Sequence, residues 1–167
     1  MTIAEFNALP PDEMRNKLYT CCSSVTWVEH LATLAPFNSM DHLFNMAERC
    51  WHRCREGDWM DAFGGHPRLG DIESLEEKFQ NTADIAAEEQ SGTTGASPEV
   101  LKELAVANEE YEKKFGFIFI LFATNKTADT MLSAMQIRLN NDLETEKIMA
   151  MVEQNKITRS RLEKILT

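Results

Sequence analysis

The sequence predicts an all-α protein in which residues 1–167 form one domain of about eight helices. Apolar residues recur at helical spacing along nearly the whole chain of 167 residues. This length suits a single hydrophobic core, and no repeat, low-complexity tract or linker marks a second domain. One short apolar run could form a strand, but the sequence offers it no partner strand.

The first three helices are predicted from their start signals, which are a capping box, a proline at the first helical position and a serine N-cap. These signals are Thr2 with Glu5, Pro10 with Pro11, and Ser23 or Ser24. A fourth, amphipathic helix is predicted from Asp41 and gives way around residues 56–58. The tract that follows, residues 58–63, makes at most a turn and a half before Gly64 and Gly65.

The second half of the chain is predicted to begin with an amphipathic helix that carries Leu75 and Phe79 and ends at Gly92. Ser97 and Pro98 give the start signal of a long helix. The apolar stripe of this long helix contains Leu101, Leu104, Asn108, Tyr111 and Phe115.

The segment FGFIFILFA, residues 115–123, has the composition of either a buried strand or a buried helix. Because no partner strand is available, we expect it to continue the preceding helix, with a bend at Gly116. Three further helices are predicted after a loop at residues 124–129. Their apolar residues are Met131, Leu132, Met135 and Leu139, then Leu143, Ile148 and Val152, then Ile157, Leu162 and Ile165.

The net charge of −10 disfavours nucleic acids and anionic membranes as partners, because their phosphates would be repelled. No Lys/Arg-rich run offers a local basic patch. The most apolar segment is too short to span a bilayer, and the N-terminus lacks the pattern of a secretory signal. We therefore expect a soluble, cytoplasmic protein.

The four cysteines could be imagined as metal ligands, since Cys50 and Cys54 lie one helical turn apart with His52 between them. However, zinc sites usually use tight CxxC turns, and His52 points away from the face of the two cysteines. Reduced and mostly buried thiols are the simpler interpretation. No metal site is predicted.

The stretch DAFGGHPRLGD, residues 61–71, interrupts the helical pattern with glycines and a proline. His66 follows Gly65 and precedes Pro67, so its side chain is displayed from a loop. Glycines also let a backbone approach a ligand closely. From this stretch alone, His66 could equally cap a neighbouring helix.

The chain resembles the 2-oxo-4-hydroxy-4-carboxy-5-ureidoimidazoline (OHCU) decarboxylase family of urate breakdown over nearly its whole length. Six pieces carry this resemblance in order and at the expected spacing. They are CCSSVTWVEHLATLAPF (21–37), DWMDAFGGHPRLGD (58–71), EQSG (89–92), NEEYEKKFGFIFILFAT (108–124), RLNND (138–142) and KITRSRL (156–162).

The resemblance implies a helical, usually dimeric enzyme that needs no cofactor and converts OHCU to (S)-allantoin. It makes His66 the proton donor and Glu89 a second catalytic group that accepts hydrogen bonds from the substrate or polarises His66. Functional coupling to urate oxidase and 5-hydroxyisourate hydrolase is expected. The residues expected to bind the substrate are Pro67, Ala86, Gln90, Ile118, Phe119, Ile120, Leu121, Phe122 and Arg138.

Two residues depart from the family pattern. Cys22 replaces a frequent glycine, and Ala86 stands where relatives commonly have a serine, so one substrate hydrogen bond is lost or moved. An acidic protein also needs a local cation for the substrate carboxylate, and either Arg68 or Arg138 could provide it. We favour Arg138, although a structural salt bridge would explain it as well.

Two other classes of function remain open from the sequence. A non-catalytic helical interaction module would use the acidic surface and the nine methionines as an adaptable groove. A metal-dependent hydrolase would use the histidines and cysteines.

Overall fold

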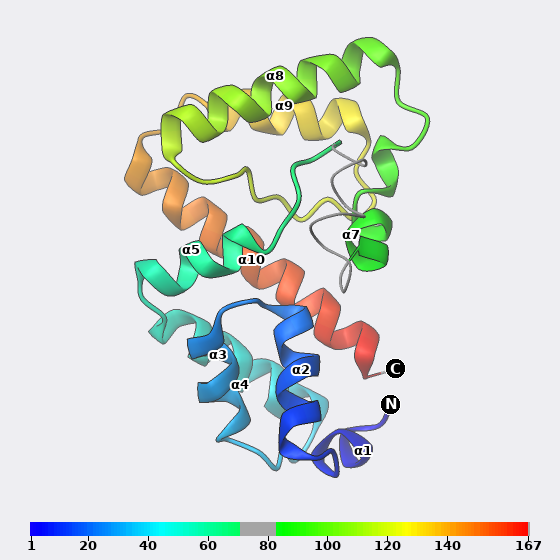
Figure 1. Cartoon of the computed structure of the whole chain (residues 1–167), viewed down its shortest axis with the longest axis vertical. Coiled ribbons are helices and arrows are strands. Elements are labelled where there is room, and N and C mark those ends of the chain that lie inside the picture. Colours follow the sequence, from blue (N-terminus) through cyan, green and yellow to red (C-terminus); the bar gives the residue numbers. More distant parts are fainter. Residues whose placement is uncertain (71–82, 167) are drawn as a thin grey trace. The chain divides into compact units, whose positions relative to one another are not determined.

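The computed structural model describes residues 1–70 and 83–166 (Figure 1). These residues form nine α-helices and one short 3-10 helix and contain no strand, so the prediction of an all-α fold is confirmed. The helices are α1 (Ile3–Asn7), α2 (Pro11–Cys21), α3 (Val25–Ala32), α4 (Met40–Arg53), α5 (Glu56–Gly64), α7 (Ala83–Glu89), η1 (Ser91–Thr93), α8 (Pro98–Phe115), α9 (Ala128–Arg138) and α10 (Leu143–Ile165).

The chain divides into two compact units. The terminal unit consists of residues 1–62 and 155–167, and the central unit consists of residues 63–154. The helix α10 contributes its first half to the central unit and its second half to the terminal unit. All the residues that the sequence predicts to be functional belong to the central unit.

The helices of the terminal unit begin at the predicted signals. The Glu5 amide donates to Thr2 Oγ1 at 3.2 Å and the Thr2 amide donates to Glu5 Oε2 at 2.7 Å, which completes the capping box of α1. Pro11 opens α2, and Ser24, not Ser23, caps α3. The helix α3 packs against both α2 and α4. All four cysteines belong to this unit and are buried, free thiols.

The central unit is organised by α8, which runs beside α9 (Figure 1). Ser97 caps α8 and Pro98 is its first residue, as predicted. At the other end, the ammonium group of Lys114 donates to the carbonyl oxygens of Leu139 and Asn141, at 2.5 and 2.9 Å. One lysine therefore ties the end of α8 to the turn that follows α9. The buried residues of α8 are Leu104, Ala107, Asn108, Tyr111 and Phe115.

The predicted helical continuation through residues 116–123 is wrong. The helix α8 ends at Phe115, and Gly116 follows with a positive φ of 82°, the left-handed geometry that favours glycine at a helix C-cap. Residues 118–123 form neither a helix nor a strand. An apolar run normally satisfies its backbone through one of these ladders, so residues 118–123 need hydrogen-bond partners from elsewhere in the protein.

Two further helices differ from the prediction. The last two predicted helices are one continuous helix, α10. The helix α5 has nine residues, which is longer than the turn and a half expected of its tract. The predicted helix ending at Gly92 is observed as α7 followed by η1, while its Leu75 and Phe79 lie outside the described residues.

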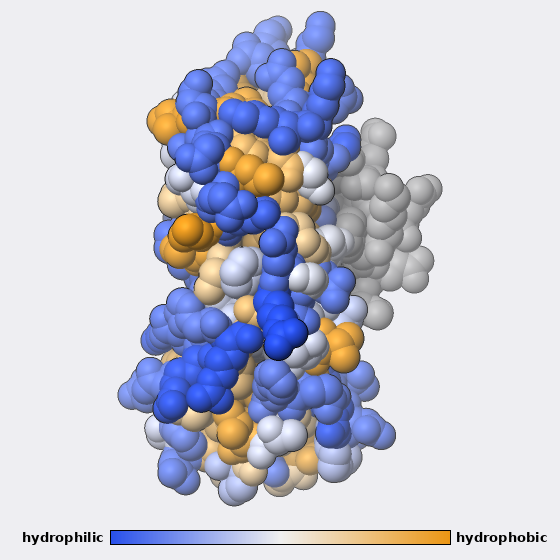
Figure 2. All heavy atoms as spheres, turned by 90° about the vertical axis from the view of Figure 1, so that its left-hand side faces the viewer, coloured by the Kyte–Doolittle hydropathy of each residue, from blue (hydrophilic) through white to orange (hydrophobic). Residues whose placement is uncertain are grey.

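Polar side chains cover most of the face in Figure 2, and apolar side chains gather in small patches among them. In the described residues, no helix is both long enough and apolar enough to cross a membrane. Among the described residues of the central unit, the exposed large apolar side chains are Val106, Ile137, Leu143, Ile148, Met149 and Val152.

Candidate functional site

The predicted catalytic histidine lies in the loop that follows α5. The backbone N–H of His66 donates to the carbonyl oxygen of Phe63 at 3.1 Å, which closes a turn at the end of this helix. The imidazole is half-buried, and Pro67 beside it is buried. The ring atom Nε2 of His66 lies 2.7 Å from Oε1 of Gln154, a residue of α10. The loop therefore displays His66, as predicted, but a partner holds its ring.

Residues 68–70 of this loop contact other parts of the central unit, to which the loop itself belongs. Arg68 makes a bidentate ion pair with Glu112 of α8, with two N–H···O distances of 2.7 Å. The side-chain amide of Asn108 donates to the carbonyl oxygen of Leu69 at 2.9 Å. The N–H of Gly70 donates to Oε1 of Gln90 at 3.0 Å. These contacts limit how far His66 can move.

The pair Glu89 and Gln90 lies at the end of α7, and both residues are only 8% exposed. Their neighbour Glu88 is exposed, so the two adjacent glutamates occupy different environments. Because Oε1 of Gln90 accepts from Gly70, this side chain links α7 directly to the histidine loop. The buried carboxylate of Glu89 fits the predicted role in chemistry better than that of Glu88.

The surroundings of Gly92 explain why the sequence EQSG ends in glycine. A Cβ atom at this position would lie 1.7 Å from the backbone oxygen of Lys126. Lys126 belongs to the loop that follows residues 118–123, so η1 and this loop approach each other at the level of their backbones. Only a residue without a side chain allows that approach.

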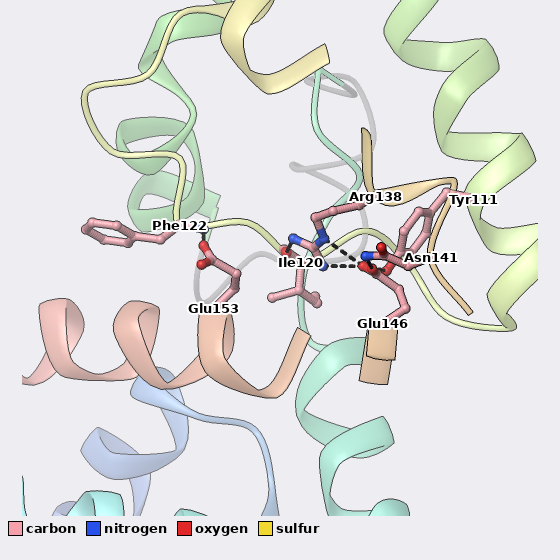
Figure 3. A network of polar contacts seen from close by, with 7 residues as sticks. All are labelled: Tyr111, Ile120, Phe122, Arg138, Asn141, Glu146 and Glu153. Carbon is pink, nitrogen blue, oxygen red and sulfur yellow. Dashed lines mark hydrogen bonds and ion pairs between the residues drawn. The ribbon is translucent and has the colours of Figure 1, made fainter. Parts of the chain in front are cut away.

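Residues 118–122, predicted to line the substrate pocket, are held by two side chains (Figure 3). The carbonyl oxygen of Ile120 accepts a hydrogen bond from Nη1 of Arg138 at 2.7 Å. The N–H of Phe122 donates to Oε2 of Glu153 in α10 at 2.8 Å. Phe119 and Ile120 are buried, while the remaining three residues are half-buried. Charged side chains thus replace part of the ladder that a helix or strand would have supplied.

Arg138 is buried in a network with Glu146, which Figure 3 shows from close by. The same carboxylate accepts hydrogen bonds from the Tyr111 hydroxyl and from the Asn141 amide, the latter at 2.9 Å. Burial, together with the bond to Glu146, raises the pKa of Tyr111 above its ordinary value. The guanidinium group also lies over the ring of Phe119, 4.3 Å from its centroid.

These contacts bear on both arginines proposed for the substrate carboxylate. Arg138 forms the structural salt bridge that was the alternative to a substrate contact, and Arg68 is paired with Glu112. The contact between Arg138 and a substrate stays a prediction. The predicted role of Ala86 depends on a side chain outside the described ones.

Sequence reasoning missed three residues of α10, which are Glu146, Glu153 and Gln154. The first binds Arg138, the second binds the backbone of Phe122, and the third binds His66. All three are buried polar residues on the helical stripe that also carries Ala150 and Ile157. A polar residue at a core position of a helix was the available signal, because such a group is buried only with a partner.

Two features concern the alternative functions. Among the described residues, no group of three or more His, Cys, Asp or Glu side chains is arranged to hold a metal ion. A surface hollow of about 250 Å³ lies between α8 and α9, and it is the type of feature that an interaction module would use. Its lining residues are Lys102, Glu103, Val106, Ala107, Glu110, Gln136 and Leu139.

Comparisons with known proteins point in one direction. The sequence model of the family described as OHCU decarboxylase matches residues 7–163. A crystal structure of OHCU decarboxylase in the presence of (S)-allantoin is 32% identical in sequence, with a TM-score of 0.76. That match covers 90% of this chain and 97% of the other.

Two curated relatives differ in how much of their length is matched. A uric acid degradation bifunctional protein of Arabidopsis thaliana is 31% identical over 88% of this chain, but the match covers 45% of the relative. The chain thus spans less than half of that bifunctional protein. A 2-oxo-4-hydroxy-4-carboxy-5-ureidoimidazoline decarboxylase of Haloferax volcanii is 26% identical over 97% of this chain and 94% of its own length.

Proposed function

The chain belongs to the OHCU decarboxylase family, and from this premise we propose that it is a carboxy-lyase that converts OHCU to (S)-allantoin in urate degradation. The reaction removes carbon dioxide from the substrate and adds one proton. We further propose that residues 1–167 act as one catalytic domain and that the enzyme needs no cofactor.

The chemistry of the substrate makes a cofactor unnecessary. Its carboxylate is attached to a carbon that also bears a hydroxyl group and neighbours a C=N bond. When the bond to the carboxylate breaks, its electron pair forms a C=C bond to the neighbouring carbon, and the C=N pair moves onto nitrogen. A proton then adds to that neighbouring carbon on one face, and the hydroxyl proton moves to the nitrogen to leave the carbonyl group of the product. The protein must hold the carboxylate out of the ring plane, stabilise the displaced charge and deliver that proton.

The observation that carries this proposal is the set of hydrogen bonds joining the three predicted parts of the site. Gly70 of the histidine loop binds Gln90, which connects this loop to the buried Glu89. Adjacent residues of α10 bind His66 and Phe122, which connects the same loop to residues 118–122. The proposed proton donor His66, the buried carboxylate of Glu89 and residues 118–122 are thus parts of one connected framework, which supports their assignment to one site.

In this proposal His66 donates the proton, because an imidazole exchanges protons near neutral pH. Glu89 accepts hydrogen bonds from the substrate hydroxyl or ureido groups, or polarises His66. Gln90 presents the donor end of its amide, since its carbonyl end is bound to Gly70. The apolar side chains of residues 118–122 exclude water, which strengthens each of these electrostatic contacts.

In this proposal Arg138 supports the pocket by donating a hydrogen bond from its guanidinium group to the carbonyl oxygen of Ile120. We propose that the enzyme is a homodimer in the cytoplasm, where a reducing environment keeps its four thiols free. We also propose that it works with urate oxidase and 5-hydroxyisourate hydrolase, since the substrate is labile and must be consumed where it is made.

The test is turnover of substrate generated in place by urate oxidase and 5-hydroxyisourate hydrolase, followed by circular dichroism at wavelengths where allantoin absorbs. We expect an optically active product from the earliest times, in the presence of excess chelator. A racemic product would mean that the protein merely binds, as an interaction module would. Loss of activity with EDTA and its recovery with zinc would favour a metal-dependent enzyme.

The variant His66→Asn tests the proton donor in the same assay. We expect turnover to fall by about 10²- to 10⁴-fold, the usual contribution of general acid catalysis. The helical circular dichroism should persist, because the side chain is displayed from a loop. His52→Asn is the matched control, since His52 is exposed in α4 and should leave turnover unchanged. Normal activity of His66→Asn would exclude this histidine as the donor.

A further inference from the structure

The hydrogen bond between His66 and Gln154 has a direct chemical consequence. A side-chain amide oxygen accepts hydrogen bonds and cannot donate them. Because Oε1 of Gln154 lies 2.7 Å from Nε2 of His66, this ring nitrogen must carry a hydrogen. In the neutral imidazole, the other nitrogen, Nδ1, then carries none.

Gln154 is placed to enforce this state of the ring. It is fully buried in α10, whereas the imidazole is half-buried. A fully buried glutamine cannot exchange its protein hydrogen bonds for bonds to bulk water. The contact is therefore expected to persist rather than to exchange with solvent.

The neighbour of Gln154 makes a second contact with the site. Glu153 is also buried, and its carboxylate accepts the N–H of Phe122 at 2.8 Å, as Figure 3 shows. Successive residues of a helix point about 100° apart, so one turn of α10 reaches two different segments. This turn fixes the histidine loop on one side and residues 118–122 on the other.

We infer that Gln154 is a positioning residue, which holds His66 as the Nε2–H tautomer and in one ring orientation so that proton transfer takes place at Nδ1. This inference rests on the proposed decarboxylation. In the cationic ring both nitrogens carry hydrogens. Departure of carbon dioxide leaves a C=C bond to the ureido-bearing carbon, with the former C=N pair on the ring nitrogen. The Nδ1–H bond then breaks as the C=C pair forms the new C–H bond at the ureido-bearing carbon. The hydroxyl proton moves to the ring nitrogen to leave a carbonyl group, and the neutral imidazole remains bound to Gln154 through Nε2–H.

Gln154→Met tests this role because methionine has a similar length and helix propensity but cannot accept this hydrogen bond well. We expect kcat to fall by about 10- to 100-fold, by analogy with the loss of a group that orients a metal-bound histidine. The KM should change little, because Gln154 does not touch the substrate in this scheme. The optical purity of the first product should fall, since a loosened ring competes less well with water for delivery of the proton.

Two variants serve as controls. Gln136→Met makes the same substitution at an exposed position of α9 and should leave kcat and optical purity unchanged. Gln154→Glu keeps an acceptor of the same size, so it should restore the tautomer and the optical purity. A purely structural role would instead make Gln154→Glu as harmful as Gln154→Met, because both remove the native amide from a buried position.

The decisive measurement is the ¹⁵N NMR spectrum of the His66 ring, which reports the tautomer and needs no turnover. We expect the neutral Nε2–H form in the wild type and a mixture of tautomers in Gln154→Met. An Nδ1–H form in the wild type would overturn the inference even if no variant folded, as would an unchanged tautomer and kcat in Gln154→Met. A fixed tautomer in a protein without decarboxylase activity would support the positioning role while refuting the proposed function.

Discussion

Arg138 of α9 and Glu146 of α10 form a buried ion pair in which the two side chains are 7% and 0% exposed. The pair also anchors residues 118–122, because Arg138 donates to the carbonyl oxygen of Ile120. Two charges taken out of water are tolerated only together, so each residue depends on the other.

We therefore expect Arg138→Met to lower the free energy of unfolding by about 3–5 kcal/mol, since it leaves the carboxylate of Glu146 buried without its cation. Urea denaturation measures this change. Arg159→Met is the matched control, because the pair between Arg159 and Glu163 is about half-exposed on both sides. Its loss should cost at most about 1 kcal/mol. Equal costs for the two variants would contradict the description of Arg138 as a structural residue.

The adjacent glutamates of α7 provide an internal control for catalysis. Glu89→Gln keeps the size of a buried side chain and removes its charge, so transition-state stabilisation should fall by roughly 2 to 4 kcal/mol. Glu88 is exposed, and Glu88→Gln should change turnover only slightly. Both variants should melt within a few degrees of the wild type. If Glu88→Gln were the inactive one, the assignment of Glu89 would be wrong.

Gly92 and Gly57 offer a matched pair of glycine substitutions. Gly92→Ala forces a Cβ atom against the backbone of Lys126, so we expect a loss of stability of about 1–3 kcal/mol, as for other overpacked sites. Gly57 lies in α5, and a Cβ atom added there would meet nothing within 4 Å. Gly57→Ala should therefore stabilise the protein by about 0.5–1 kcal/mol. Thermal melting distinguishes these outcomes, and a neutral Gly92→Ala would show that the two backbones can separate.

The buried thiols should be unreactive at neutral pH. Burial raises the pKa of both Cys22 and Cys54 from the ordinary 9.0 to about 12, so neither forms a thiolate near pH 8. We expect Ellman's reagent to detect all four thiols in guanidinium chloride and almost none in the folded protein. The same thiols have a lower pKa in the unfolded protein than in the folded one. The free energy of unfolding should therefore fall as the pH rises from about 9 towards 12. Rapid labelling of the folded protein at pH 8 would contradict the first expectation, and a free energy of unfolding that stays constant from about pH 9 to 12 would contradict the second.

The helix starts could be predicted because their signals are local. The capping box of Thr2 and Glu5 and the cap at Ser97 involve residues three positions apart, and the structure forms them as the sequence indicates. The helical spacing that exposes Glu88 and buries Glu89 is also a local feature. Such features follow from the geometry of one helix and need no knowledge of the rest of the chain.

The backbone conformation of residues 118–123 could not be predicted in this way. Residues 118–123 have the composition of a strand or a buried helix, but their backbone bonds to Arg138 and Glu153, which come from positions 18 and 31 residues further along the chain. The role of Gln154 depends likewise on a residue 88 positions away. Side-chain contacts of this range arise only when the helices pack, so local periodicity can mark a buried polar residue but does not identify its partner.

A chain whose cysteines are all buried can accept a reporter group without prior removal of its native residues. Ser91 is exposed and directly follows Gln90, which makes Ser91→Cys a suitable position for a maleimide-linked fluorophore. Its emission would follow occupancy of the neighbouring site in real time, including the association of product or of stable substrate analogues. Ligand affinity could then be separated from the lifetime of an intermediate that decays spontaneously in water.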